Sequence, residues 1–220
     1  MTEVKDNIER GTVLLPIARA AIARALKVPH AVDETAPWLS ERGACFVTLT
    51  QFGELRGCIG SLQAHRSLLE DVKSNAVSAA FRDPRFTPMN TEELDITTVE
   101  VSLLSPSQEM QVLDEADALA QMRPGVDGII FEYGRYRSTF LPQVWEDLAR
   151  PRDFLAMLRR KAGLPDDFWS EDVRLSRYTV TKWSESENLL KEPLADRLGE
   201  QTTLAKSPVM AAHPKEYKHG

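Results

Sequence analysis

Residues 43–62 read GACFVTLTQFGELRGCIGSL, and this stretch decides the fold. Two short runs, ACFVTLT and ELRGCIGSL, are rich in β-branched and apolar residues and flank the segment Gln51-Phe-Gly-Glu54. A glycine at a turn position between two such runs is typical of a β-hairpin. We therefore predict two antiparallel strands joined by a tight turn.

A helix and a third strand are predicted after the hairpin. Apolar residues recur at helical spacing over Leu68–Phe81, and Asp83-Pro84 then ends the helix. Asn75 lies on the apolar face of this helix, so its side chain needs a hydrogen bond, most simply a structural one. Residues 95–104, DITTVEVSLL, again have the composition of a strand.

The order hairpin–helix–strand recurs downstream. Residues 127–183 contain a second hairpin with its turn at Gly134, a helix in two pieces around Pro151, and a last strand over 173–183. The sequence thus predicts an α+β fold with mainly antiparallel sheet, in which this unit duplicates the one formed by residues 43–104.

The two ends of the chain have a different character. An amphipathic helix is predicted over residues 14–26, with Pro16 in its first turn. Its arginines interrupt the apolar runs, which fits neither a signal peptide nor a membrane-spanning helix. One domain is expected over residues 1–183, followed by a flexible or loosely docked tail over 184–220.

The composition narrows the function classes. The chain of 220 residues carries 27 Lys and Arg against 33 Asp and Glu, a net charge of −6, so it lacks the basic character of nucleic-acid binders. Its two cysteines and four scattered histidines form neither a disulfide framework nor a zinc-ligand pattern, and we expect no metal site. A reducing cytoplasm is the expected location.

The strand Leu55–Gly60 carries the most informative side chains. Strand alternation puts Arg56, Cys58 and Gly60 on one face, and a guanidinium about 7 Å from a thiol favours the thiolate. Gly57 and Gly60 leave room for a ligand or another backbone. Alternatively, Cys58 is a small buried apolar residue and the glycines serve strand packing.

Cys45 is assigned to packing. If Val47 pairs with Cys58 across the hairpin, Cys45 lies diagonally on the same face, about 7–8 Å away, which is long for a disulfide. A two-cysteine redox switch is the less favoured alternative.

Charged residues near the hairpin complete the candidate site. Glu100 lies in mid-strand, where a buried carboxylate needs a partner, and Arg56 is the predicted one; the alternative is that Glu100 faces solvent. Arg82 and Arg85 flank a rigid turn and are expected to bind a carboxylate or phosphate, unless Asp83 caps the turn and the arginines form surface pairs. The candidate catalytic residues are Cys58, Arg56 and Glu100; the candidate ligand-binding residues are Gly57, Gly60, Arg82, Asp83 and Arg85.

Seven sequence runs stand in the order seen in the AMMECR domain family, which the chain resembles from about residue 14 to residue 183. They are ACFVTL, LRGCIGSL, LLEDVKSNAVSAAFRDPRF, EVSLLSP, RPGVDGII, TFLPQVW and KAGLP. The resemblance implies an α+β fold with a larger and a smaller part around a cleft. It also implies that LRGCIG (residues 55–60) and FRDPRF (residues 81–86) form a functional site.

The resemblance also implies partners. In bacteria and archaea, proteins of this family are called AmmeMemoRadiSam system protein A, a name that records co-occurrence with a Memo-like protein and a radical S-adenosylmethionine protein. This chain has no CxxxCxxC iron–sulfur pattern, so the radical chemistry is expected in the partner. The resemblance names no cofactor.

Two functions stay open at this point. The first is a ligand-binding or catalytic cleft around LRGCIG for a small molecule, with Cys58 as nucleophile or acid. The second is a non-catalytic binding or scaffold component that docks onto the Memo-like or radical protein through an apolar patch beside the motif. A nucleic-acid role in repair or translation is the least favoured because the chain is acidic.

Overall fold

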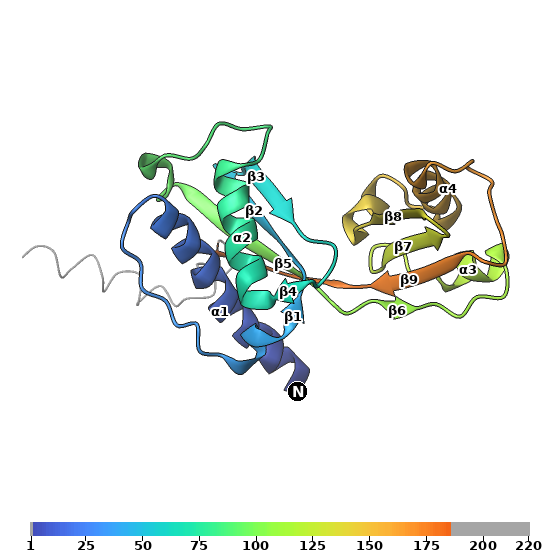
Figure 1. Ribbon diagram of the computed structural model, residues 1–220, viewed down its shortest axis with the longest axis horizontal. Helices are drawn as coiled ribbons and strands as arrows, with labels where there is room; N and C mark the ends of the chain where they lie inside the picture. Colours follow the sequence, from blue (N-terminus) through green and yellow to red (C-terminus); the bar gives the residue numbers. More distant parts are fainter. Residues whose placement is uncertain (1, 186–220) are drawn as a thin grey trace, which may run out of the picture. The chain divides into compact units, whose positions relative to one another are not determined.

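The computed structural model describes residues 2–185, which form two antiparallel four-stranded sheets with helices packed against them (Figure 1). The helices are α1 (Thr2–Ala25), α2 (Leu68–Phe81), α3 (Glu115–Gln121) and α4 (Pro151–Ala162). The strands are β1 (Arg42–Gly43), β2 (Cys45–Gln51), β3 (Glu54–Gly60), β4 (Arg66–Ser67), β5 (Thr97–Leu104), β6 (Gln108–Glu109), β7 (Gly128–Tyr133), β8 (Tyr136–Phe140), β9 (Arg174–Tyr178) and β10 (Val180–Ser184).

The predicted order hairpin–helix–strand is present in both sheets. The first sheet has the strand order β10-β5-β2-β3, and the second has β6-β9-β7-β8. Within them, β5-β2-β3 and β9-β7-β8 are the same arrangement of a hairpin and the strand that follows its helix. The α+β fold class and the antiparallel pairing predicted from the sequence are confirmed.

The hairpin β2–β3 has its turn in the predicted segment Gln51–Glu54, and the turn has two residues. Phe52 and Gly53 have φ values of 53° and 86°, the positive pair that a type I′ turn requires. The ladder is not regular, however. Leu49 pairs with Gly57, but Thr50 pairs with Leu55, so Arg56 is an extra residue in a β-bulge.

The last predicted strand, residues 173–183, is divided in the structure. β9 joins the second sheet and β10 joins the first, and Thr179 lies between them. The backbone N–H of Ser105 donates to the Thr179 carbonyl at 2.9 Å, and the Thr179 N–H donates to the Ser105 hydroxyl at 3.0 Å. The chain passes from the second sheet to the first through a single residue, Thr179, which belongs to neither strand. The sequence pattern of residues 173–183 therefore has no break, although it forms two strands.

Helix α1 is longer than predicted, so Pro16 lies inside it and not in its first turn. A proline inside a helix costs about 3 kcal/mol through its missing hydrogen bond. The side chains around it, Leu14, Leu15 and Ile17, are fully buried, and their packing offsets that cost.

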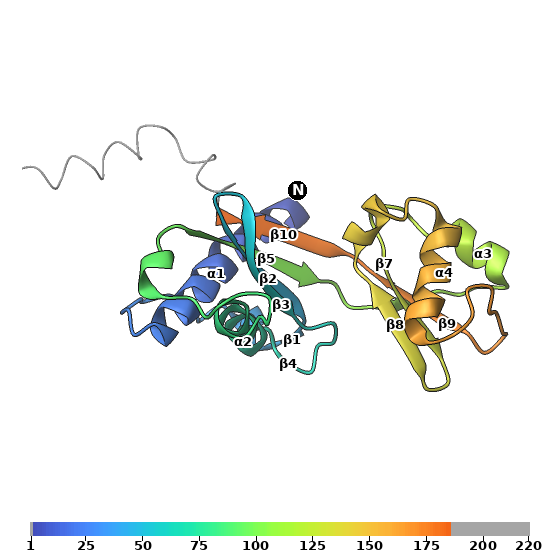
Figure 2. The ribbon, with the colours of Figure 1, turned by 90° about the horizontal axis from the view of Figure 1, so that it is seen from above.

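Helices α1 and α2 cover one face of the first sheet and enclose the larger core (Figure 2). On β2 the side chains of Cys45, Val47 and Leu49 point into this core, whereas Thr48 on the other face is only half-buried. A second core lies between α4 and the second sheet. Among residues 2–185 no helix is both long and apolar enough to cross a membrane.

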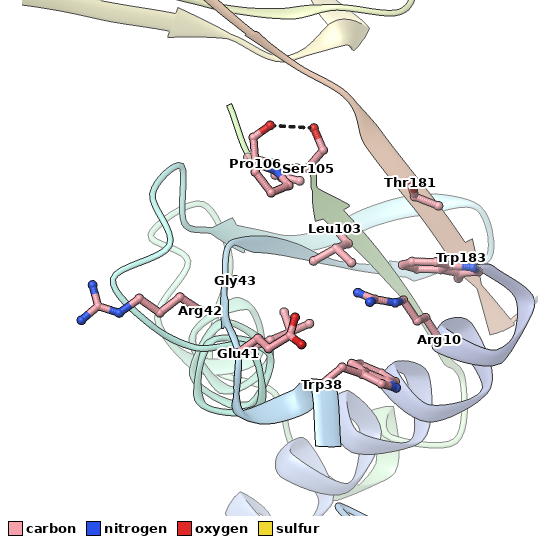
Figure 3. A pocket seen from close by; sticks show the side chains of 12 residues that line it. Arg10, Trp38, Glu41, Arg42, Gly43, Leu103, Ser105, Pro106, Thr181 and Trp183 are labelled. Carbon is pink, nitrogen blue, oxygen red and sulfur yellow. Dashed lines mark hydrogen bonds between the residues drawn. The ribbon is translucent and has the colours of Figure 1, made fainter. Parts of the chain in front are cut away.

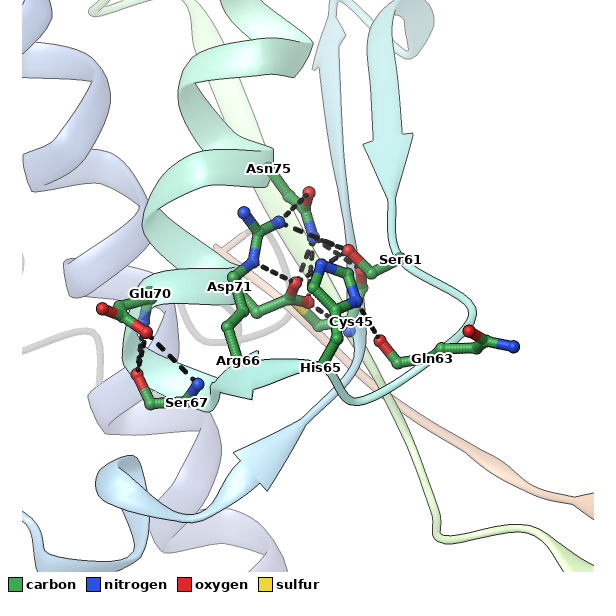
Figure 4. A network of polar contacts seen from close by, with 9 residues as sticks. All are labelled: Cys45, Ser61, Gln63, His65, Arg66, Ser67, Glu70, Asp71 and Asn75. Carbon is green, nitrogen blue, oxygen red and sulfur yellow. Dashed lines mark hydrogen bonds and ion pairs between the residues drawn. The ribbon is translucent and has the colours of Figure 1, made fainter.

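A buried carboxylate ties helix α2 to the hairpin (Figure 4). Asp71 has no exposed surface, and its Oδ2 accepts from the Cys45 N–H at 2.8 Å and from Asn75 Nδ2 at 3.0 Å. Its Oδ1 accepts from Ser61 Oγ at 2.7 Å and from Arg66 Nε at 2.8 Å. Asn75 also donates to the Cys45 carbonyl at 2.9 Å, so its predicted structural hydrogen bond is present.

Replacing the Asp71 carboxylate should be costly. Asp71→Asn keeps the size of the side chain but turns an amide N–H toward groups that themselves donate, and we expect a loss of about 3 kcal/mol in the free energy of unfolding. The adjacent Glu70 caps α2 from the surface, so Glu70→Gln should change the free energy of unfolding by no more than about 0.5 kcal/mol. Urea unfolding measures both values, and equal losses would contradict this account of Asp71.

Candidate functional site

The bulge separates the residues of the LRGCIG motif. A Cβ on Gly57 would lie 2.2 Å from the Ala79 carbonyl oxygen of α2, so Gly57 faces the helices. Cys58 pairs with Thr48 and lies on the opposite face of the sheet. The prediction that Arg56 shares a face with Cys58 and Gly60 is wrong, because the extra residue turns Arg56 toward the segment that follows α2.

Arg56 is buried and bound to groups of that segment. Its Nε donates to Glu93 Oε1 at 2.7 Å, its Nη2 donates to the Thr87 carbonyl at 2.8 Å, and its guanidinium lies 5.9 Å from the centre of the Phe86 ring. Hydrogen bonding from Arg56 lowers the pKa of Glu93 to about 2. Within the described residues, Nη1 of Arg56 is buried without a hydrogen-bond partner.

The predicted pair of Arg56 with Glu100 is therefore also wrong. Glu100 lies on the opposite face of the sheet, and its carboxylate is 3.2 Å from the Lys182 ammonium on β10. The partner of Arg56, Glu93, belongs to a short 3-10 helix that Asn90 and Glu93 cap reciprocally. Asn90-Thr-Glu-Glu93 is a capping-box pattern in the sequence, but this pattern gives no hint of a bond to Arg56.

Asp83 and Arg85 close the open edge of β3. Asp83 Oδ2 accepts from the Cys58 N–H at 2.9 Å, in the place where a further strand would pair. Arg85 donates to both oxygens of Asp83, at 2.9 and 2.7 Å, and this bonding holds the pKa of Asp83 well below its usual range. Of the predicted anion-binding arginines, Arg85 thus has a carboxylate within the chain, while Arg82 is exposed at the end of α2.

A row of polar side chains crosses the sheet face that the helices leave uncovered. Thr48 Oγ1 donates to Cys58 Sγ at 3.3 Å, and Thr48 pairs with Glu100 on its other side. Cys58 and Glu100 are therefore on one face, as the prediction of a shared site requires, but about 10 Å apart across Thr48. Cys58 is half-buried, and Arg85 Nη2 donates to its backbone carbonyl at 3.5 Å.

The register of the hairpin also decides the place of Cys45. Thr48, not Val47, pairs with Cys58, so the two cysteines point to opposite faces and the prediction that they share one is wrong. Cys45 is buried in the core, and burial raises the pKa of its thiol. The packing assignment for Cys45 agrees with this position.

Three cavities in the described part of the chain are lined by residues outside LRGCIG. A hollow of about 460 Å³ is lined by Ala44, which precedes β2, by Leu104 of the first sheet, and by Ile130, Arg137 and Tyr178 of the second. The residues from Leu55 to Gly60 do not line it. In the part of the chain that the structure describes, no three His, Cys, Asp or Glu side chains are grouped to hold a metal ion.

The two motif glycines should differ in their tolerance of a side chain. A Cβ at Gly57 meets backbone, whereas a Cβ at Gly60 would lie 2.2 Å from Cγ of Phe46, a half-buried side chain that can move by changing its χ1 rotamer. Gly57→Ala should lower the free energy of unfolding by about 3 kcal/mol and Gly60→Ala by about 1 kcal/mol. Urea unfolding of the pair tests this, and a larger loss for Gly60→Ala would refute the packing explanation of Gly57.

Known proteins resemble this chain over most of its length. Protein MJ0810 of Methanocaldococcus jannaschii is 39% identical over 190 residues, which cover 82% of this chain and 92% of that protein. A protein of Methanothermobacter thermautotrophicus is 38% identical, covering 77% of this chain and 91% of its own length.

The fold has a counterpart of known structure. The crystal structure of the uncharacterized protein PH0010 from Pyrococcus horikoshii matches with a TM-score of 0.66 at 36% identity, covering 80% of this chain and 92% of that one. The model of the AMMECR1 family matches residues 15–183, which include the hairpin, the Asp83–Arg85 segment and both sheets. The chain therefore belongs to the AMMECR1 family.

Proposed function

We propose that the protein is a ligand-binding or catalytic component centred on Cys58, and that it acts on a small molecule together with a Memo-like protein and a radical S-adenosylmethionine protein. The observation that supports this most is the half-exposed thiol on an edge strand whose backbone Asp83 holds in place. Such a thiol is accessible and fixed in direction, which are the two requirements for a nucleophile, an acid or a ligand-binding group.

The neighbours of Cys58 have distinct parts in this proposal. Thr48 donates to the sulfur and orients it. Arg85 keeps a half-exposed guanidinium beside it, which favours an anionic ligand. Glu100, with Lys182 beside it, supplies a carboxylate further along the same face.

The remaining motif residues support the site in this proposal without touching the ligand. Arg56 binds the segment after α2 to the hairpin, Gly57 lets α2 approach, and Asp83 holds the Cys58 N–H. Gly60 leaves space for Phe46 on the same face as Cys58.

Replacing the thiol tests this proposal without knowledge of the substrate. Cells that encode Cys58→Ser should show the same changes in metabolite profile as cells that lack the gene, because the reactive sulfur is gone. Cells that encode Cys45→Ala, which alters the buried cysteine, should match the unmodified strain. A Cys58→Ser protein that accumulates normally and leaves the profile unchanged would overturn the role of Cys58.

A second candidate, docking onto a partner protein, has its own support at the tip of the hairpin. Phe52, Leu55 and Ile96 are 86%, 41% and 45% exposed, and the pairing of Gln51 with Thr97 brings them to one end of the first sheet. A positive φ is unfavourable for a bulky residue such as Phe52, and asparagine or glycine is preferred there. An aromatic residue that is both strained and exposed, as Phe52 is, supports a role in binding a partner protein.

A substitution that relieves the strain at Phe52 should raise the stability of the protein and weaken its binding to the partner. Phe52→Asn should raise the free energy of unfolding by about 1 kcal/mol, because asparagine adopts the left-handed conformation readily. It should also weaken binding to the purified Memo-like or radical S-adenosylmethionine protein by about tenfold in calorimetry. Leu113→Ser, at a 95% exposed site near α3, is the control and should leave binding unchanged. If neither protein binds the unmodified chain, docking through this tip is excluded.

A further inference from the structure

A second hollow, of about 390 Å³, lies on the helix side of the first sheet, away from Cys58 (Figure 3). Residues of α1, of the segment before β1, of β5 and of β10 line it. This volume is in the range of cavities that hold small ligands. Neither the LRGCIG residues nor the Asp83–Arg85 segment contributes to it.

Two indole rings form walls of this cavity. Trp38 stands in the short 3-10 helix Pro37–Ser40, and Trp183 stands in β10, so distant parts of the chain bring them together. A Cβ on Gly11 would lie 2.4 Å from Cδ1 of Trp183, so only glycine lets that ring lie against α1. Flat, half-buried aromatic surfaces favour a planar apolar group between or against them.

Two opposite charges face the same space. The Arg10 guanidinium lies 4.9 Å from the centre of the Trp38 ring, and Figure 3 shows Arg10 and Glu41 directed toward the cavity while Arg42 points away. Among residues 9–185, whose side chains the structure describes, no carboxylate pairs with Arg10 and no basic group pairs with Glu41.

Among residues 9–185, the other arginines that are buried or half-buried all have a carboxylate partner. The side chains of Arg19, Arg56, Arg66 and Arg159 each have a carboxylate partner, namely Glu185, Glu93, Asp71 and Glu115. A guanidinium held over an indole ring without such a partner keeps its donors available to a carboxylate from outside. Glu41 in turn offers acceptors to an ammonium group.

We propose that this cavity binds a small zwitterion with a flat apolar group, of the class of aromatic α-amino acids. Arg10 binds the carboxylate, Glu41 binds the ammonium, and the ring lies against Trp38 and Trp183. A simple anion is less suited because Glu41 repels it, and a simple cation is less suited because Arg10 does. This site is independent of the function proposed for Cys58.

Three probes with the same ring separate these charges: L-phenylalanine, 3-phenylpropionate and phenethylamine. Because a phenyl ring does not absorb where tryptophan is selectively excited, a ligand that contacts Trp38 and Trp183 changes the summed emission of the four tryptophans. L-Phenylalanine should give a saturable change at concentrations below about 10 mM and bind most tightly of the three. The change should be reduced in Trp183→Phe.

Charge-removing variants make the assignment specific. Arg10→Gln should lower the affinity for L-phenylalanine by roughly tenfold and leave the affinity for phenethylamine unchanged or raise it. Glu41→Gln should lower the affinity for L-phenylalanine and leave the affinity for 3-phenylpropionate unchanged or raise it. Arg24→Gln, on the same helix but paired with Glu34 outside the cavity, is the matched control and should bind as the original. The proposal is overturned if no probe saturates, or if Arg10→Gln and Glu41→Gln affect all three probes alike in proteins with unchanged unfolding temperatures.

Discussion

The carboxylate of Asp71 has no contact with water, and this sets strict conditions on its surroundings. A buried negative charge requires donors at every acceptor position, and the chain supplies them from the start of β2, from the segment after β3 and from α2 itself. Helix α2 can therefore sit in only one position on the hairpin. That position decides how closely Ala79 approaches Gly57, and where the segment carrying Asp83 and Glu93 begins.

The regular elements could be predicted from the sequence because each has its own period and its own end signals. The turn at Phe52-Gly53 and the bounds of α2 are of this kind. The bulge at Arg56 is not, since one inserted residue exchanges the faces of a strand and no residue type marks it. For this reason strand alternation assigns Arg56 wrongly to the face of Cys58, and with it the predicted pair of Arg56 and Glu100 fails. The partner of Arg56, Glu93, is 37 residues away, a distance over which no periodicity connects two side chains.

The arginines of this protein fall into two groups according to where their counter-charges lie. Arg56 and Arg85 bind carboxylates of the same chain, and through them they hold the motif strand against α2 and close its free edge. Such residues are recognisable from a motif, yet their main contacts serve the fold. Arg10 belongs to no motif noted in the sequence, and no carboxylate of residues 9–185 pairs with it. A charged side chain whose hydrogen-bonding groups have no partner within the chain is thus a better indicator of a ligand site than a charged side chain of the conspicuous motif.

The exchange of strands between the two sheets has a consequence for the order of synthesis. The first sheet contains β2, β3 and β5, but its outer strand is β10, which ends at Ser184. Glu185 then binds Arg19 of α1, with 2.6 Å between Nε and Oε1. During translation, the edge of β5 stays unpaired until the whole second sheet has been made. A nascent chain that stalls before residue 180 would expose that edge to other chains, so completion of the N-terminal sheet depends on a strand made after the second sheet.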